Sequence, residues 1–144
     1  MHKTHATELL VGGVRSTSRL GNIARGAVAA ALLKAGNCIL LPMNDDQRYD
    51  LVIDEGSEFL RVQCKYGRLR NDVVTFQTCS NNVSSGRRDY RDAIEYFGVY
   101  CAELGTSYLV PVDHVPLRLG SLRVGSCRNN QSQNIRWARD YLID

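Results

Sequence analysis

Two β-rich runs separated by a short polar turn constrain the fold of this chain more than any other feature. Residues 48–53 read RYDLVI and residues 59–66 read FLRVQCKY. Residues 54–57 (DEGS) between them form a small polar cluster, which is typical of a hairpin turn. The sequence therefore predicts two adjacent antiparallel strands, the second of which ends at Gly67.

The period-two alternation of side chains gives the second of these strands two different faces. Gln63 and Lys65 share a polar face, whereas Val62 and Cys64 share an apolar one. Folding at the turn brings Asp50 close to Gln63 and Lys65. A carboxylate, an amide oxygen and an ammonium group are therefore expected to converge on one face of the hairpin.

Such a set of groups suits a hard divalent cation. Mg²⁺ prefers oxygen ligands, which the Asp50 carboxylate, the Gln63 side chain and the backbone carbonyl of Cys64 can supply. Lys65 can position or deprotonate a water molecule, or neutralise charge on a phosphate. The same pattern is also typical of an Asp–Lys ion pair across a hairpin, with Gln63 as a polar neighbour. The spacing alone is compatible with both interpretations.

The remaining patterns predict a single α/β domain. The Ser-Thr-Ser cluster at residues 16–18 offers N-cap hydroxyls, small and aliphatic residues recur at helical spacing up to residue 32, and Gly36 supplies a stop. Further strands are predicted at residues 38–41, 73–78, 96–101 and 107–112. A polar loop is predicted at residues 81–86, and a short amphipathic helix at residues 135–143.

This order of elements favours a mixed β-sheet with flanking helices. Residues 1–15 are poorly patterned, and we expect them to form an N-terminal arm. The folded domain is expected to comprise residues 16–144, a length that a single hydrophobic core can serve.

The cysteines and the apolar segments indicate a location inside the cell. The five cysteines are scattered and include no CxxC pair, which argues against a zinc ribbon and favours buried thiols in a reducing cytoplasm. The longest apolar stretch, residues 27–33, is far shorter than the roughly 20 residues that span a bilayer. We therefore expect no membrane segment and no signal peptide.

Charge is unevenly distributed along the chain, although the net charge is only +3. Residues 1–60 carry six basic and seven acidic side chains, whereas residues 61–139 carry twelve basic and six acidic ones. Fifteen of the basic residues are arginines, whose planar guanidinium suits phosphate groups and guanine edges. The basic second half is typical of a chain with a polyanionic partner, and equally of a solvated basic face.

An ordered series of motifs resembles the PD-(D/E)XK nuclease superfamily, and within it the group I intron-associated homing endonucleases. The resemblance extends over residues 19–141, and Gln63 stands where the superfamily usually has Asp or Glu. The series consists of LGNIA at residues 20–24, RYDLVI at 48–53, RVQCK at 61–65, the segment 90–100, YLVP at 108–111, NNQ at 129–131 and IRWA at 135–138.

The resemblance implies a PD-(D/E)XK restriction-endonuclease-like core and Mg²⁺-dependent, sequence-directed cleavage of double-stranded DNA. Asp50 would bind the metal ion, Gln63 would occupy the usual acidic ligand position, and Lys65 would be the catalytic lysine. Water would attack the phosphodiester in line and leave a 3′-hydroxyl and a 5′-phosphate. Asn22 stands at the helix position that often carries an acidic ligand, so Asp50 is left as the charged ligand unless the loop residues Asp45 and Asp46 contribute.

A homing endonuclease must contact a long DNA site, and polar residues of the second half of the chain are the candidates. Cleavage of both strands by so small a protein further implies a homodimer or a higher homo-oligomer, and a partly palindromic target. The residues that we expect to contact phosphates or base edges are Arg68, Arg70, Asn81, Asn82, Arg87, Arg88, Arg91, Arg128, Asn130 and Gln131.

Three alternatives remain open at the level of sequence. A Holliday-junction resolvase shares the core and would prefer branched substrates over linear ones. A non-cleaving DNA-binding protein on a nuclease scaffold is suggested by Asn22, and it would bind DNA in Mg²⁺ without nicking it. An interaction module with no nucleic-acid partner would not bind DNA. DNA binding whose affinity falls steeply with salt would count against this alternative.

Overall fold

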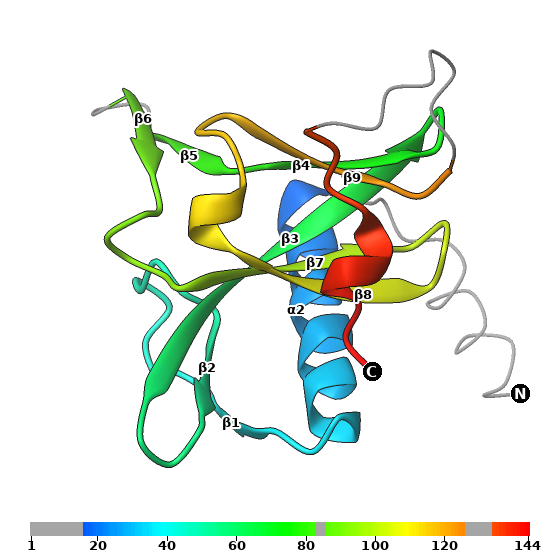
Figure 1. Ribbon diagram of the computed structural model, residues 1–144. Coiled ribbons are helices and arrows are strands. Elements are labelled where there is room, and N and C mark those ends of the chain that lie inside the picture. The colour runs from blue at the N-terminus through cyan, green and yellow to red at the C-terminus, as the bar shows by residue number, and fades with distance from the viewer. Residues whose placement is uncertain (1–15, 83–85, 126–133) are drawn as a thin grey trace, which may run out of the picture.

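A branched β-sheet with a helix packed on one face organises the chain (Figure 1). The computed structural model describes residues 16–82, 86–125 and 134–144. Its elements are α2 (Thr17–Lys34), β1 (Cys38–Leu40), β2 (Leu51–Asp54), β3 (Phe59–Arg70), β4 (Val73–Gln77), β5 (Cys79–Asn82), β6 (Gly86–Asp89), β7 (Tyr96–Cys101), β8 (Thr106–Pro111), the 3-10 turn η1 (Val112–His114), β9 (Leu119–Arg123) and the 3-10 turn η2 (Ala138–Tyr141).

The long strand β3 is the centre of the sheet. Its first part pairs with β2 antiparallel, and β7 runs parallel to it along the opposite edge, where residues 62–67 face residues 96–101. Its last part, residues 68–70, pairs antiparallel with β4, which in turn pairs with β9. β1 and β8 lie outside β2 and β7, and β5 and β6 form a separate two-stranded ribbon. This arrangement confirms the predicted mixed sheet.

The pairing of β3 leaves a gap along one of its edges. Val62 is the last β3 residue that faces β2, and Arg68 is the first that faces β4. Because backbone groups of alternate strand residues point to the same edge, residues 62, 64, 66, 68 and 70 all present their N–H and C=O groups to the edge that β2 and β4 occupy. Residues 63–67 therefore have a partner strand, β7, on one edge only.

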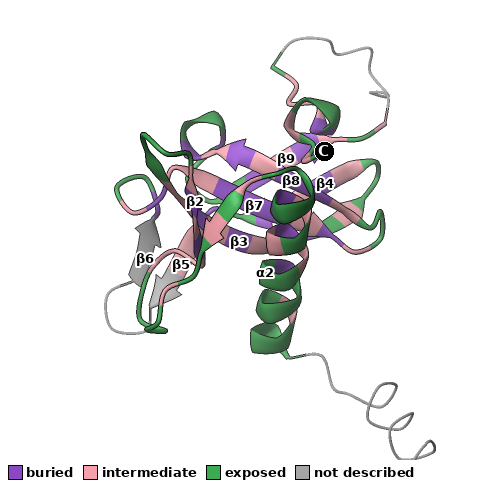
Figure 2. Cartoon of the chain, turned by 90° about the horizontal axis from the view of Figure 1, so that it is seen from below, coloured by how far each residue is buried: buried purple, intermediate pink, exposed green. Residues whose placement is uncertain are grey.

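Helix α2 covers the face of the sheet on which the predicted apolar residues of the hairpin lie (Figure 2). Ser16 caps the helix by accepting a hydrogen bond from the Arg19 backbone N–H. Ala24, Val28 and Leu32 recur every fourth residue, are buried, and pack on the sheet. The predicted helix is thus confirmed, although Ile23, one of the aliphatic residues that recur at helical spacing, is 39% exposed.

A second apolar cluster lies on the face of the sheet opposite α2. Phe97 and Val99 of β7 contribute to it, together with Phe76 of β4, Tyr90 and Leu122. Phe97 faces Gln63 in the parallel ladder, and Val99 faces Lys65. The polar residues of β3 therefore emerge beside an apolar cluster, on the side of the sheet that the helix does not cover.

The structure corrects the predicted end of β3. The strand does not end at Gly67 but continues to Arg70, where Asn71 and Asp72 turn the chain into β4 with φ angles of 51° and 62°. Two successive left-handed residues are the geometry of a type I′ hairpin turn, which suits Asn and Asp. A Cβ atom at Gly67 would lie 2.8 Å from Val74 Cγ1 and 2.9 Å from Val99 Cγ1, so the close approach of neighbouring side chains explains this glycine.

Two other sequence predictions differ from the structure. The segment predicted as a polar loop over residues 81–86 contains parts of the β5–β6 ribbon. The C-terminal segment is not an α-helix but a 3-10 turn between two isolated bridges. Its backbone N–H and C=O groups are used by neighbouring strands instead, because Arg123 N–H bonds to the Arg136 carbonyl and Ile143 N–H bonds to the Ser107 carbonyl.

The structure agrees with the prediction of buried thiols for some of the described cysteines and not for others. Cys64 and Cys101 are buried free thiols and Cys79 is half-buried, but Cys38 is exposed, so the prediction of buried thiols is wrong for Cys38. Within the described ranges, no helix has the length and hydrophobicity needed to cross a membrane. The N-terminal arm, residues 1–15, lies outside the described residues.

The contact between α2 and the sheet makes Gly98 a sensitive position. A Cβ atom at Gly98 would lie 2.6 Å from Val28 Cγ1 and 3.1 Å from Val62 Cγ1, and both valines are stiff and buried. Gly98→Ala should therefore lower the free energy of unfolding by about 1–3 kcal/mol through overpacking. Gly26→Ala, where the added Cβ meets open space, should instead be neutral or stabilise the helix by up to about 1 kcal/mol. Urea unfolding of both variants tests this, and a Gly98→Ala variant as stable as the wild type would contradict it.

Candidate active site

Asp50 closes part of the gap in the edge of β3. It directly precedes β2 and donates its backbone N–H to the Val62 carbonyl at 2.8 Å. Its carboxylate oxygen Oδ2 accepts a hydrogen bond from the Cys64 backbone N–H at 2.7 Å. A side chain thus takes the place of the missing partner strand at Cys64.

The environment of Asp50 disfavours the charged form of its carboxyl group. Burial raises the pKa of its carboxyl above the ordinary value, because desolvation disfavours the charged form. The hydrogen bond from Cys64 and the positive charges of Arg25 and Lys65 act in the opposite direction but do not cancel this effect. The carboxylate is therefore a partly desolvated anion that a bound cation would stabilise.

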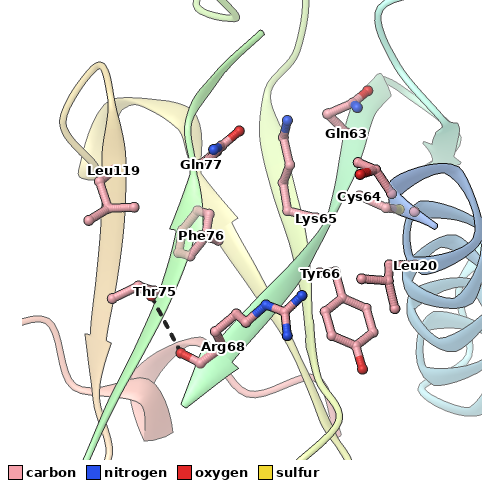
Figure 3. Close-up of a pocket in the computed structure, with 12 residues that line it drawn as sticks. Leu20, Gln63, Cys64, Lys65, Tyr66, Arg68, Thr75, Phe76, Gln77 and Leu119 are labelled. Atoms are coloured by element: carbon pink, nitrogen blue, oxygen red, sulfur yellow. Dashed lines mark hydrogen bonds between the residues drawn. The ribbon is translucent and has the colours of Figure 1, made fainter. Parts of the chain in front are cut away.

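Lys65 and Gln63 line a groove that runs along the open edge of β3. The groove has a volume of about 500 Å³, and it is lined on one side by helix residues such as Leu20 and on the other by β4 residues such as Phe76. Figure 3 shows the Lys65 side chain extending into the space between β3 and β4, with Gln63 and Gln77 on either side of it. The amide and ammonium groups that were predicted to share one face therefore open into the same groove.

Asp50 and Lys65, both within the described residues, do not form the cross-hairpin ion pair that the sequence left open. The salt bridge found among the described residues joins Arg61 and Glu95, with Nε and Oε2 3.0 Å apart. Lys65 instead donates a hydrogen bond from Nζ to the Tyr90 hydroxyl at 3.4 Å. Lys65 and Asp50 still interact electrostatically, since the lysine charge lowers the pKa of the Asp50 carboxyl.

A polar cavity of about 400 Å³ lies on the other side of Asp50. Asp45 lines it together with Asp50, so the loop brings a second acidic residue to the space beside Asp50. The polar lining also includes amide side chains and one cation, namely Asn22, Asn44, Gln47 and Arg25. No three His, Cys, Asp or Glu side chains gather into a metal-binding group in the described parts of the chain. The donors that are present offer oxygen atoms, which fits a hard cation such as Mg²⁺ better than a soft one.

Cys64 contributes to this site through its backbone. Its thiol is buried on the helix side, and burial together with the neighbouring Asp50 charge raises the pKa of the thiol, so it remains protonated. The carbonyl of Cys64 points to the same edge as its own N–H, which donates a hydrogen bond to the Asp50 carboxylate. The carbonyl oxygen is therefore the group of Cys64 that faces the site.

The structure distributes the predicted DNA-contacting residues over several segments. Arg68 and Arg70 are exposed at the end of β3, and the Arg68 guanidinium carbon lies 5.5 Å from the centre of the Tyr66 ring. Arg91 is exposed beyond the ribbon. The β5–β6 ribbon carries Asn81, Asn82, Arg87 and Arg88. The remaining predicted residues, Arg128, Asn130 and Gln131, lie outside the described residues.

Four residues at or beside the site were not predicted from the sequence to have a role there. Gln77 is exposed on β4, and its alternation with buried Phe76 is a signal that could have identified it. Arg25 lies three residues after Asn22 and thus on the same helix face. Tyr90 and Arg48 are distant in the sequence but in contact in the structure, where the Arg48 guanidinium carbon lies 4.3 Å from the centre of the Tyr90 ring. No local sequence pattern predicts this contact.

Comparison with known proteins identifies the family of this chain. A sequence model described as "PD-(D/E)XK endonuclease" matches residues 15–144. Among solved structures, that of a bacterial homing endonuclease, I-Ssp6803I, is similar with a TM-score of 0.68 and 25% sequence identity, and the match covers 89% of each chain. No curated protein matches the sequence. Because the family model spans nearly the whole chain and the fold agrees, the protein belongs to the PD-(D/E)XK endonuclease family and is a DNA endonuclease.

Proposed function

We propose that the protein is a homing-type endonuclease that cuts double-stranded DNA at a defined sequence in the presence of Mg²⁺. The observation that carries this proposal is the open edge of β3. Gln63, Cys64 and Lys65 line a groove at this edge, and the Asp50 carboxylate accepts a hydrogen bond from the Cys64 backbone N–H. The similarity to a bacterial homing endonuclease supports the homing type.

In this proposal, Asp50, Gln63 and the Cys64 carbonyl hold the metal ion. When bound, Mg²⁺ supplies Lewis-acid polarisation of a phosphate oxygen and a more acidic water molecule. The ammonium group of Lys65 orients water at the scissile phosphate and neutralises the charge that develops there. The desolvated Asp50 carboxylate favours cation binding because the cation relieves an existing electrostatic penalty.

The surface beside the groove supports DNA as the ligand. Arg68 lines the groove itself, and Arg70 is exposed two residues later on the same side of β3. Both would contact phosphates flanking the scissile bond, which is the commonest role of arginine at DNA. The β5–β6 ribbon carries the asparagines and arginines that we expect to contribute further contacts, and it has the two-stranded shape that a major groove admits.

Cleavage of both DNA strands requires two copies of this active site, so a homodimer or higher homo-oligomer remains our prediction. Asn22 in the cavity, in place of a carboxylate, favours one competing function, a protein that binds DNA without cutting it. The two functions differ in whether the wild-type protein cuts the DNA that it binds.

Lys65→Met should reduce DNA cleavage by about 100-fold or more, because it removes the charged group at the reacting phosphate. DNA affinity should remain close to that of the wild type, since one of many cationic contacts is lost. Nicking of a supercoiled plasmid carrying the native flanking DNA measures this. Lys34→Met, at the exposed end of α2, is the matched control and should cleave normally. Wild-type cleavage by Lys65→Met would remove Lys65 from the chemistry, and DNA binding without any metal-dependent nicks by the wild type would establish the non-cleaving alternative.

Asp50→Asn should abolish cleavage yet raise the melting temperature at neutral pH in the absence of metal. The raised pKa of Asp50 means that the folded state loses stability as the pH rises through that pKa, and a neutral side chain avoids this loss. Mg²⁺ should stabilise the wild type by about 2.7 kcal/mol at 100 times its dissociation constant, but should leave Asp50→Asn unchanged. The affinity of the wild type for Mg²⁺ should weaken as the pH falls through the same pKa, which lies above the ordinary aspartate value of 3.8.

Thermal melts with and without Mg²⁺ at several pH values test these expectations without any DNA. Equal stabilisation of wild type and Asp50→Asn by Mg²⁺ would show that the metal binds elsewhere.

Asp45→Asn should raise the Mg²⁺ concentration needed for half-maximal cleavage severalfold, because Asp45 offers a second carboxylate to the cavity beside Asp50. Asp46→Asn changes the neighbouring exposed residue, which does not line that cavity, and serves as the control for loop charge. Mg²⁺ titrations of both variants decide the point, and identical curves for Asp45→Asn and Asp46→Asn would exclude Asp45 as a contributor.

A further inference from the structure

The catalytic lysine of the proposed function is held by an aromatic residue from a distant part of the chain. Lys65 Nζ donates a hydrogen bond to the Tyr90 hydroxyl at 3.4 Å and lies 4.8 Å from the centre of the Tyr90 ring. The ammonium group therefore contacts both the hydroxyl oxygen and the electron-rich ring, and each of these contacts favours a cation.

Tyr90 is itself fixed in place. Its side chain is buried, with 5% of the residue exposed, and its ring meets the edge of Phe97 at a centroid distance of 5.6 Å and an interplanar angle of 84°. Its backbone carbonyl accepts hydrogen bonds from the N–H groups of Ala93 at 2.9 Å and Ile94 at 3.0 Å. An anchored ring is a suitable support for a flexible lysine side chain.

Arg48 adds a second restraint on the same ring. Its guanidinium carbon lies 4.3 Å from the ring centre, and its Nη2 donates to the Ser80 hydroxyl of β5 at 3.3 Å. Arg48 precedes Asp50 by two residues, so the segment that leads into the candidate metal ligand and the lysine on β3 both contact Tyr90. One buried ring thus fixes the two sides of the site relative to each other.

We infer that Tyr90 is a positioning residue for catalysis, which holds the Lys65 ammonium group at the reacting phosphate. This inference rests on the proposed function of Lys65. A lysine side chain has several freely rotating bonds, and a group that is poorly oriented contributes little to a transition state. The Tyr90 hydroxyl selects one orientation before DNA binds, and the ring supports it.

Tyr90→Phe removes the hydroxyl and keeps the anchored ring. The variant should lower kcat for DNA cleavage about tenfold, which is the effect of one hydrogen bond to a charged group, while KM and DNA affinity stay at their wild-type values. Tyr100→Phe makes the same chemical change on β7, in the cluster on the helix side, and is the matched control. Its kcat should equal that of the wild type, and both variants should melt close to the wild type.

Lysine NMR gives a readout that a purely structural role would not change. The chain has three lysines, Lys3, Lys34 and Lys65, so protein labelled with ¹³C at lysine Cε yields three signals, and Lys65→Met identifies the third. In the wild type, relaxation should show the Lys65 side chain as less mobile than that of exposed Lys34. In Tyr90→Phe its mobility should rise toward that of Lys34, whereas Tyr100→Phe should leave it unchanged.

The outcomes separate the inference from the function on which it rests. If Lys65→Met is inactive but Tyr90→Phe cleaves at the wild-type rate, the positioning role is wrong and the nuclease proposal stands. If Lys65→Met cleaves normally, the proposed role of Lys65 fails, and the positioning role fails with it. A Lys65 signal equally mobile in the wild type and in Tyr90→Phe would also overturn the inference.

Discussion

The hydrogen bond from the Cys64 backbone N–H to the Asp50 carboxylate is the interaction on which the site depends. It forms because β2 begins after Asp50 while β3 continues past Val62, so Cys64 presents its N–H to an edge without a strand. The carboxylate fills that position and is thereby partly buried. The backbone carbonyl of Cys64 points to the same edge, and Cys64 lines the groove there.

The branching of β3 turns this local gap into a groove. β2 and β4 pair with the same edge of β3 at different positions along the strand, and helix α2 packs on one face of the sheet. Gly67 allows the branch, since neighbouring valine side chains from β4 and β7 occupy the space where a Cβ would lie. The position of the gap therefore follows from strand lengths, and the side chains that line it follow from alternation along β3 and β4.

The balance of charge around Asp50 distinguishes this chain from the acidic pattern of its superfamily. Asn22 and Gln63 are neutral, and Arg25 adds a positive charge to the cavity beside Asp50. A site of this composition binds a divalent cation more weakly than a cluster of carboxylates does. Phosphate oxygens of bound DNA would therefore have to supply more of the ligands. Metal binding and DNA binding are then expected to be coupled.

The sequence was sufficient for features that depend on local periodicity. The hairpin and the helix follow from alternation, a turn and an N-cap, and so does the proximity of Asp50 to the part of β3 that carries Cys64 and Lys65. The continuation of β3 beyond Gly67 did not follow, because a glycine within a strand resembles a stop unless the neighbouring valines are known.

Contacts between distant segments were also not predictable. Tyr90 and Lys65 are 25 residues apart and meet only because the chain returns past the β5–β6 ribbon to β7. The C-terminal segment has the spacing of a helix, but its backbone hydrogen bonds go to β8 and β9. Both cases depend on partners that a single sequence does not reveal.

The most direct test of the central claim is a crystal structure of the protein with Mn²⁺, whose anomalous scattering locates it, and a DNA duplex that contains the target. The account predicts an anomalous peak about 2.0–2.3 Å from an Asp50 carboxylate oxygen, at the open edge of β3 and next to a phosphate. A well-ordered complex in which the metal ion and the scissile phosphate both lie away from this edge would contradict it.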